Sequence, residues 1–184
     1  MNGNLGVSQE SAVAGANHRT LRFVLIFVGT LLAAFGVLLT GPAQYLDARL
    51  SLALVKVAHG VLVGCGGYAT RDDAILRAPG GFAVEMREGC NGINVTILLW
   101  SAILAFPARW RMKAIGLIAG SLIIQVLNIA RFISLFYLGQ YSLTWFDFAH
   151  TYLWESMLVL DTMVIFWLWV NRVVRLDAAA CAPV

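Results

Sequence analysis

The chain has 184 residues, of which 60% are apolar and only 12% are charged. A soluble domain usually carries about 25% charged residues, so this chain has too little polar surface for a soluble enzyme or a disordered chain. The same shortage of charge argues against a nucleic-acid binder, and the net charge of +3 is small. With a mean hydropathy of +0.78, the composition indicates an integral membrane protein of one domain.

The first 20 residues are polar and small, and they are predicted to form a flexible cytoplasmic tail. Four apolar stretches follow that are candidates for transmembrane helices, at residues 23–39, 93–106, 114–138 and 151–170. We therefore expect an all-α integral membrane fold, a bundle of about four transmembrane helices within residues 21–176. Residues 177–184 are predicted to be a short C-terminal tail.

Basic residues cluster before the first span, between the second and third, and after the fourth. These residues are His18, Arg19 and Arg22, then Arg109, Arg111 and Lys113, then Arg172 and Arg175. By the positive-inside rule, all three clusters belong in the cytoplasm. Both termini are then cytoplasmic, and residues 41–92 and the short 139–150 loop lie outside.

The apolar segment 43–63 carries charges that an ordinary span lacks, including Asp47, Arg49 and Lys56. Arg49 and Lys56 share one helix face, and apolar residues occupy much of the rest: Leu46, Leu50, Leu54, Val57 and Val61. This pattern predicts an extracytoplasmic amphipathic helix at the membrane interface. A fifth span is the alternative, although it disturbs the orderly distribution of basic residues.

Residues 74–78 and 82–87 have a composition compatible with β-strands, and Pro79-Gly80-Gly81 separates them. Two short strands around such a turn predict a small β-hairpin. This hairpin delivers the chain to Cys90, immediately before the second span.

Three side chains capable of chemistry stand at the edges of different spans: Cys90, Arg131 and His150. Counted from the cytoplasmic basic clusters, at a helix rise of about 1.5 Å per residue, they lie about 28, 27 and 33 Å from the inner edge. Polar groups at such depths are costly and need a reason. If the spans pack as a bundle, the three meet at the outer boundary.

A thiol, an imidazole and a guanidinium suit the chemistry of an amide bond. The pKa of a cysteine falls at a helix N-terminus, and Cys90 opens a span. His150 can take the thiol proton and return it to a leaving amine, and Arg131 can stabilise an oxyanion or hold a substrate carbonyl or carboxylate. Plain structural roles compete with this interpretation, namely a packing cysteine, an arginine that reaches the headgroups and an interfacial histidine.

Other polar residues in the spans are less specific. Ser121, Gln125 and Asn128 form a polar stripe that leads along the third span to Arg131. Asp161 shares the helix face of His150 but lies about 16 Å deeper, too far to orient the imidazole. Glu155 points elsewhere.

These residues resemble the motifs of the exosortase/archaeosortase family. The matching segments are Glu88-Gly89-Cys90-Asn91-Gly92-Ile93, Asn128-Ile129-Ala130-Arg131 and Ala149-His150-Thr151-Tyr152-Leu153-Trp154. The similarity covers roughly residues 75–170, and all three motifs occur in the family's order. Within the family the chain looks most like the short exosortase H, which is associated with proteins ending in an IPTLxxWG-type motif.

The resemblance implies a membrane-embedded cysteine transpeptidase or protease with Cys90, Arg131 and His150 as catalytic residues. Glu88, Asn91 and Asn128 belong to the same motifs and are expected to bind substrate or support the site. Substrates would be exported, membrane-tethered proteins with a C-terminal sorting signal, consisting of a motif, a transmembrane helix and a basic tail. Cys90 would form a thioester that an unknown amine acceptor or water resolves.

The resemblance further implies a multi-pass protein of the bacterial inner membrane, with its active site at the periplasmic face. No metal or organic cofactor is required.

Two other functions remain open from the sequence. One is a non-catalytic scaffold or escort protein that uses Gly116 and Gly120, a small-residue motif typical of helix–helix contacts. The other is a redox protein that uses Cys65 and Cys90 as a pair.

Overall fold

The computed structural model describes residues 3–87 and 89–180, with side chains described for residues 17–87 and 89–176. The helices are α1 (Gly3–Leu38), α2 (Gly41–Gly64), α3 (Ile93–Ala105), α4 (Trp110–Tyr141), α5 (Leu143–Phe148) and α6 (Trp154–Ala180), with a π-helical turn η1 (Ala149–Leu153) between α5 and α6. The strands are β1 (Thr70–Asp72), β2 (Ile75–Arg77) and β3 (Ala83–Glu85). The expected all-α membrane fold is confirmed.

Within the described residues, three helical segments are long and apolar enough to cross a membrane: Asn17–Leu38, Trp110–Tyr141 and Leu143–Leu176. They correspond to the first, third and fourth predicted spans. The second is the apolar helix α3, which has only 13 residues and is therefore about 20 Å long. Since a hydrocarbon core is about 30 Å thick, α3 covers part of that depth, and the chain before it continues toward the sheet.

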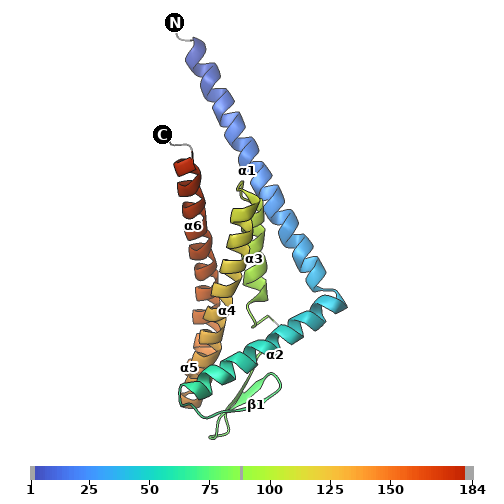
Figure 1. Cartoon of the computed structure of the whole chain (residues 1–184), viewed down its shortest axis with the longest axis vertical. Coiled ribbons are helices and arrows are strands. Elements are labelled where there is room, and N and C mark those ends of the chain that lie inside the picture. The colour runs from blue at the N-terminus through green and yellow to red at the C-terminus, as the bar shows by residue number, and fades with distance from the viewer. Residues whose placement is uncertain (1–2, 88, 181–184) are drawn as a thin grey trace.

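The two ends of the molecule differ in character. Both termini and the connection between α3 and α4 lie toward one end, and the sheet and α5 lie at the other, here called the sheet end (Figure 1). The segments that carry the three basic clusters are therefore away from the sheet. This arrangement agrees with the expectation that both termini share one side.

Helix α2 begins at Gly41-Pro42, where proline fits the first turn because its missing N–H needs no partner there. It runs obliquely across the sheet end of the bundle (Figure 1), and it is not among the described helices that qualify as spans. The structure thus favours the interfacial helix over a fifth span. Of its apolar residues, Leu46, Val57 and Val61 are exposed. The buried residues are Asp47, Ser51, Leu54, Val55, Ala58 and Leu62.

The two strands of the predicted hairpin are confirmed, but the sheet has a third strand. β2 pairs antiparallel with β3, and β1 pairs antiparallel with β2, so the strand order is β1-β2-β3. All three residues of β1 are exposed. The sequence pattern misses this strand because an edge strand with two solvated faces shows no apolar alternation.

Two further segments differ from the expectation. α1 is helical from Gly3, so most of the predicted tail continues the first span. Ala, Ser, Gln and Glu in residues 3–20, with no proline, allow a helix to propagate from the span. The predicted 139–150 loop is helical as well, because no glycine or proline between Tyr141 and Arg172 ends a helix. Predicted tail residues 1–2 and 181–184 lie outside the described residues.

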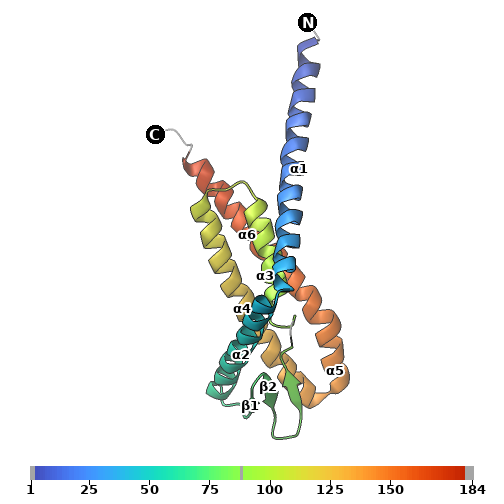
Figure 2. The ribbon, with the colours of Figure 1, turned by 90° about the vertical axis from the view of Figure 1, so that its right-hand side faces the viewer.

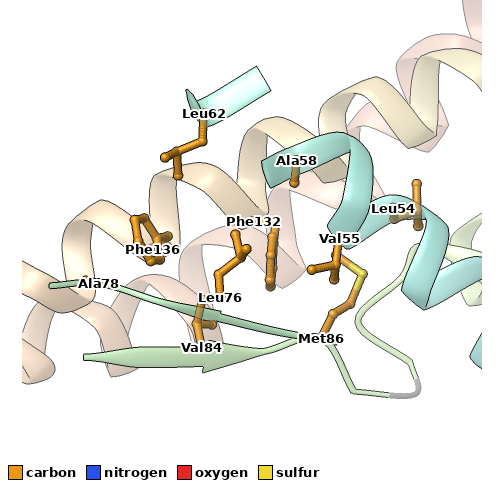
Figure 3. Packing of buried hydrophobic residues seen from close by; sticks show 10 residues of the cluster. All are labelled: Leu54, Val55, Ala58, Leu62, Leu76, Ala78, Val84, Met86, Phe132 and Phe136. Atoms are coloured by element: carbon orange, nitrogen blue, oxygen red, sulfur yellow. The ribbon is translucent and has the colours of Figure 1, made fainter. Parts of the chain in front are cut away.

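Two apolar clusters organise the packing. The sheet-end cluster joins α2, the sheet and α4, as Figure 3 shows, and consists of Leu54, Val55, Ala58, Leu62, Leu76, Ala78, Val84, Met86, Phe132 and Phe136. The bundle cluster joins α3, α4 and α6 and consists of Leu99, Ile103, Ile124, Trp169 and Val173. The candidate site lies beside the first cluster.

Candidate functional site

A glycine-flanked turn presents Cys90 just before α3. Gly89 and Gly92 have φ of 84° and 79°, a left-handed conformation that glycine adopts without steric cost. The main-chain N–H of Cys90 donates to the carbonyl of Arg87 at 3.0 Å. A Cβ atom at Gly92 would lie 3.5 Å from the amide carbon of Asn128. The two glycines are therefore required by the backbone of the turn that presents Cys90, and a Cβ at Gly92 would make only ordinary van der Waals contact with α4.

A buried polar network ties this turn to α2. The amide Nδ2 of Asn91 donates to the carboxylate of Asp47 and, at 3.0 Å, to the hydroxyl of Ser51. Its Oδ1 accepts the main-chain N–H of Ile93 at 3.1 Å, which satisfies one free donor of the first turn of α3. Asp47 is only 5% exposed. The network therefore anchors Asn91, the residue after Cys90, to α2 on one side and to the first turn of α3 on the other.

Cys90 and His150 are in direct contact. The Sγ of Cys90 lies 3.8 Å from the Nε2 of His150, within hydrogen-bond distance for sulfur. The imidazole stacks on Phe146, with ring centroids 5.8 Å apart and planes 19° from parallel. His150 lies in η1, and single π-helical turns within helices frequently occur at functional sites. The aromatic ring and the π-helical turn fix the imidazole toward the sulfur.

Arg131 brings a buried positive charge to the same place. It is 5% exposed, and it lines the same cavity as Cys90 and His150. Among the described residues it forms no ion pair. Because an unpaired buried charge is costly, such a guanidinium is suited to bind an anion that arrives or forms during a reaction.

Asn128 lies one helical turn before Arg131 on α4. Its side chain is 0% exposed, and neither its amide nitrogen nor its amide oxygen has a hydrogen-bond partner in the described structure. Buried polar groups in proteins are nearly always paired. The free amide therefore indicates a place for a ligand with hydrogen-bonding groups.

A cavity of about 210 Å³ connects these groups. Cys90, Arg131, His150 and Asn128 line it, together with all three residues of β3. Its remaining lining is Arg87, Phe132, Leu135 and Phe146. Arg87 and Glu85 form an ion pair at 3.2 Å, but both side chains are exposed, so the pair contributes little to stability.

The structure thus brings Cys90, Arg131, His150 and Asn128 to one cavity, from the turn before α3, from α4 and from η1. Asn91 does not line this cavity and is engaged by α2, so it is placed to hold the turn rather than to touch a substrate. Glu88 lies outside the described residues. The chemical roles of these residues stay predictions.

Several residues near the site did not emerge from the sequence. Asp47 stood out only as a charge in an apolar helix, and Phe146 only as one aromatic residue among many. Glu85 and Arg87 belonged to the predicted hairpin without a role. Glu155, which the helix geometry directed away, is exposed and does not line the cavity. Cys65 is exposed and free, and does not line the cavity.

A comparison with known protein families bears on the family to which the chain belongs. The family model of transmembrane exosortases (Exosortase_EpsH) matches residues 12–170. Neither the curated proteins nor the solved structures contain a match to the chain. The matched region includes the Cys90 turn, all of α4 and the η1 turn with His150. Because this match covers most of its length, the chain belongs to the transmembrane exosortase family.

Proposed function

We propose that this protein is a membrane-embedded cysteine transpeptidase or protease that cleaves the C-terminal sorting signal of exported, membrane-tethered proteins. Membership of the exosortase family supports a sorting-signal processing role in the membrane. The observation that carries the proposed mechanism is the 3.8 Å contact between Cys90 and His150 in a cavity that a buried Arg131 also lines.

In the first step, Nε2 of His150 takes the proton of the Cys90 thiol. The sulfur then attacks the carbonyl carbon of the scissile peptide bond, and the carbonyl oxygen becomes an oxyanion. His150 returns the proton to the leaving amine as the C–N bond breaks. The product that remains is a Cys90 thioester, and the released fragment carries the transmembrane helix and the basic tail.

In the second step, an amine acceptor or water attacks the thioester. His150 removes a proton from this nucleophile, and the C–S bond breaks as the cysteine thiol is regenerated. The acceptor decides whether the reaction is a transpeptidation or a hydrolysis. The side chains lining the cavity allow both outcomes, since the same histidine serves either nucleophile.

Arg131 and Asn128 support the oxyanion. A guanidinium and an amide N–H that are held in place before the reaction stabilise developing negative charge more effectively than mobile water does. Both side chains are buried, both line the cavity, and within the described structure the Asn128 amide has no other partner. A free amide N–H beside a buried positive charge is what an oxyanion site requires.

We place the sheet end at the periplasmic face of the bacterial inner membrane. The basic clusters lie on segments away from the sheet, and basic residues are retained in the cytoplasm. A substrate helix can then approach within the bilayer, while its sorting motif reaches the cavity from outside.

The scaffold alternative loses its main surface in this structure. A Cβ at Gly116 would collide with the indole of Trp169, and one at Gly120 with Leu99. These glycines therefore receive side chains of α6 and α3 from the same chain, rather than leaving a face for a partner helix.

The decisive experiment co-expresses the protein with a reporter that ends in motif, helix and basic tail. Cys90→Ser and His150→Ala are expected to lower processing by about 10³-fold or more, because each removes a group of the covalent step. Both variants should accumulate in the membrane normally. In the wild type, mass spectrometry should detect a thioester between Cys90 and the reporter.

Cys65→Ser is the matched control, because Cys65 is exposed and does not line the cavity. It should process the reporter at the wild-type rate. Normal processing by Cys90→Ser would overturn the proposed function, and loss of processing in Cys65→Ser would support the redox alternative instead.

A further inference from the structure

Strand β3 is an edge of the small sheet, and its outer side is open. The main-chain N–H of Ala78 donates to the carbonyl of Phe82 at 2.8 Å, and that of Met86 donates to the carbonyl of Ala74 at 3.0 Å. In an antiparallel pair, main-chain groups alternate between the partner strand and the opposite side. The groups of Ala83 and Glu85 therefore point away from β2.

No other strand covers this edge within the described residues. The strand order is β1-β2-β3, with β3 last, and no described main-chain hydrogen bond outside the β2 pairing involves Ala83 or Glu85. In Figure 2 the open side of the sheet, away from β2, faces α5. An exposed row of N–H and C=O groups is a template for an added strand.

The open edge belongs to the cavity of the candidate site. All three residues of β3 line the cavity that Cys90 and His150 also line. The side chain of Val84 is buried in the sheet-end cluster, which also contains Phe132. The side chains of Ala83 and Glu85 point to the opposite face of the sheet and are exposed. A peptide lying along β3 is thus in the same space as the sulfur.

We propose that the sorting motif of the substrate binds in extended form along β3, as a fourth strand of the sheet, and thereby presents its scissile bond to Cys90. This inference rests on the proposed function. Main-chain groups of Ala83 and Glu85 supply the hydrogen bonds, which hold the peptide independently of its sequence.

Specificity then comes from side chains that alternate along the bound peptide. Successive side chains of a strand point to opposite faces. Those on the face toward α4 meet Phe132 and Leu135, which line the cavity. We therefore expect apolar residues at every second position of the motif, with polar residues accepted between them.

An extended peptide fits this edge better than a lipid or a helix does. Acyl chains offer no hydrogen-bonding groups to an open strand, and a helix already uses its main-chain groups internally. The residues that precede a transmembrane helix in a substrate have no such constraint and can lie extended.

The test uses two proline variants on opposite edges of the same sheet. Ala83→Pro removes an N–H that points to the proposed peptide, and edge strands tolerate proline. Arg71→Pro is the matched control: by the same alternation its N–H points outward from β1, at the far edge. Ala83→Pro is expected to raise KM for the reporter about tenfold, the effect of losing one or two hydrogen bonds. Arg71→Pro should leave KM unchanged.

A second measurement avoids dependence on the folding of the proline variants. A photo-crosslinking amino acid is placed at position 83 or at position 71 of the full-length Cys90→Ala protein in membranes that contain the reporter. Position 83 should crosslink to the sorting motif, whereas position 71 should not.

The outcomes separate the two proposals. If the wild type processes the reporter, while Ala83→Pro behaves like Arg71→Pro and position 83 does not crosslink, strand addition is wrong and the proposed function stands. If the wild type does not process the reporter, or if Cys90→Ala does, the proposed function itself fails.

Discussion

Beside the bundle cluster, the buried hydroxyl groups of Ser101 and Thr162 bond to their own helices, whereas the two buried asparagines of the sheet end bond to another element or have no partner among the described residues. Ser101 donates to the carbonyl of Ile97 at 2.9 Å, and Thr162 donates to that of Leu158 at 2.8 Å. Asn91 instead joins the Cys90 turn to α2, and Asn128 has no partner among the described residues. The two regions are thus built for different purposes.

The physical reason lies in the cost of polar groups away from water. A hydroxyl that bonds to its own helix is satisfied without help from another element. An unpaired amide or a buried cation lowers stability and persists only where something else favours it. The sheet end therefore holds the polar groups that the proposed function uses, and the bundle supplies the packed helices beside them.

After Cys90 and His150, the largest expected effect is at Arg131, where activity should fall and stability should not. Arg131→Gln removes the buried charge and is expected to lower processing about 10²–10³-fold, as for loss of an oxyanion-binding group. Its thermal stability in detergent should match or exceed that of the wild type, since an uncompensated buried charge is removed. A variant that unfolds but retains its activity per folded molecule would contradict this role.

The reverse result is expected at Gly116, in the bundle region. Gly116→Leu places a side chain where the indole of Trp169 packs, and overpacking of this kind costs about 1–3 kcal/mol. The thermal unfolding temperature should fall, while the molecules that remain folded keep their activity. The control is Gly29→Leu, because a Cβ at Gly29 meets nothing within 4 Å. Equal stability of the two variants would show that the α4–α6 contact is weak.

The smallest effect is expected at Asp47, which acts on the site only through Asn91. Asp47→Ala leaves the Asn91 amide without its carboxylate partner, so the Cys90 turn loosens and kcat should fall about tenfold with little change in KM. Asp47→Asn retains an acceptor oxygen and should recover most of the rate. A change confined to KM would place Asp47 in substrate binding instead of positioning.

Much of the fold could be predicted because its causes are local. Apolar stretches long enough to span a bilayer identify α1, α4 and α6, and Gly41-Pro42 separates α1 from α2. The turn at Pro79-Gly80-Gly81 locates β2 and β3. The strand β1 and the helix over residues 143–148 were missed, because neither shows the apolar periodicity that identifies such elements.

More of the site than of the sheet could be predicted, because helix geometry applies to the site residues. A constant rise per residue was enough to place Cys90, Arg131 and His150 at similar depths on different elements. It could not reveal Phe146 stacked on the imidazole or Asp47 bonded to Asn91, since both contacts depend on how separate elements pack.

The amino-acid sequence by itself determined that this is a membrane protein of the exosortase type, with Cys90, Arg131 and His150 on different segments. Hydropathy, charge distribution and helix rise are properties of single segments, so they can be deduced without knowing what each segment packs against. Only the tertiary structure decided that the sulfur meets the imidazole at 3.8 Å and that β3 lies open beside them. Contacts between distant segments depend on three-dimensional packing, which no local pattern encodes.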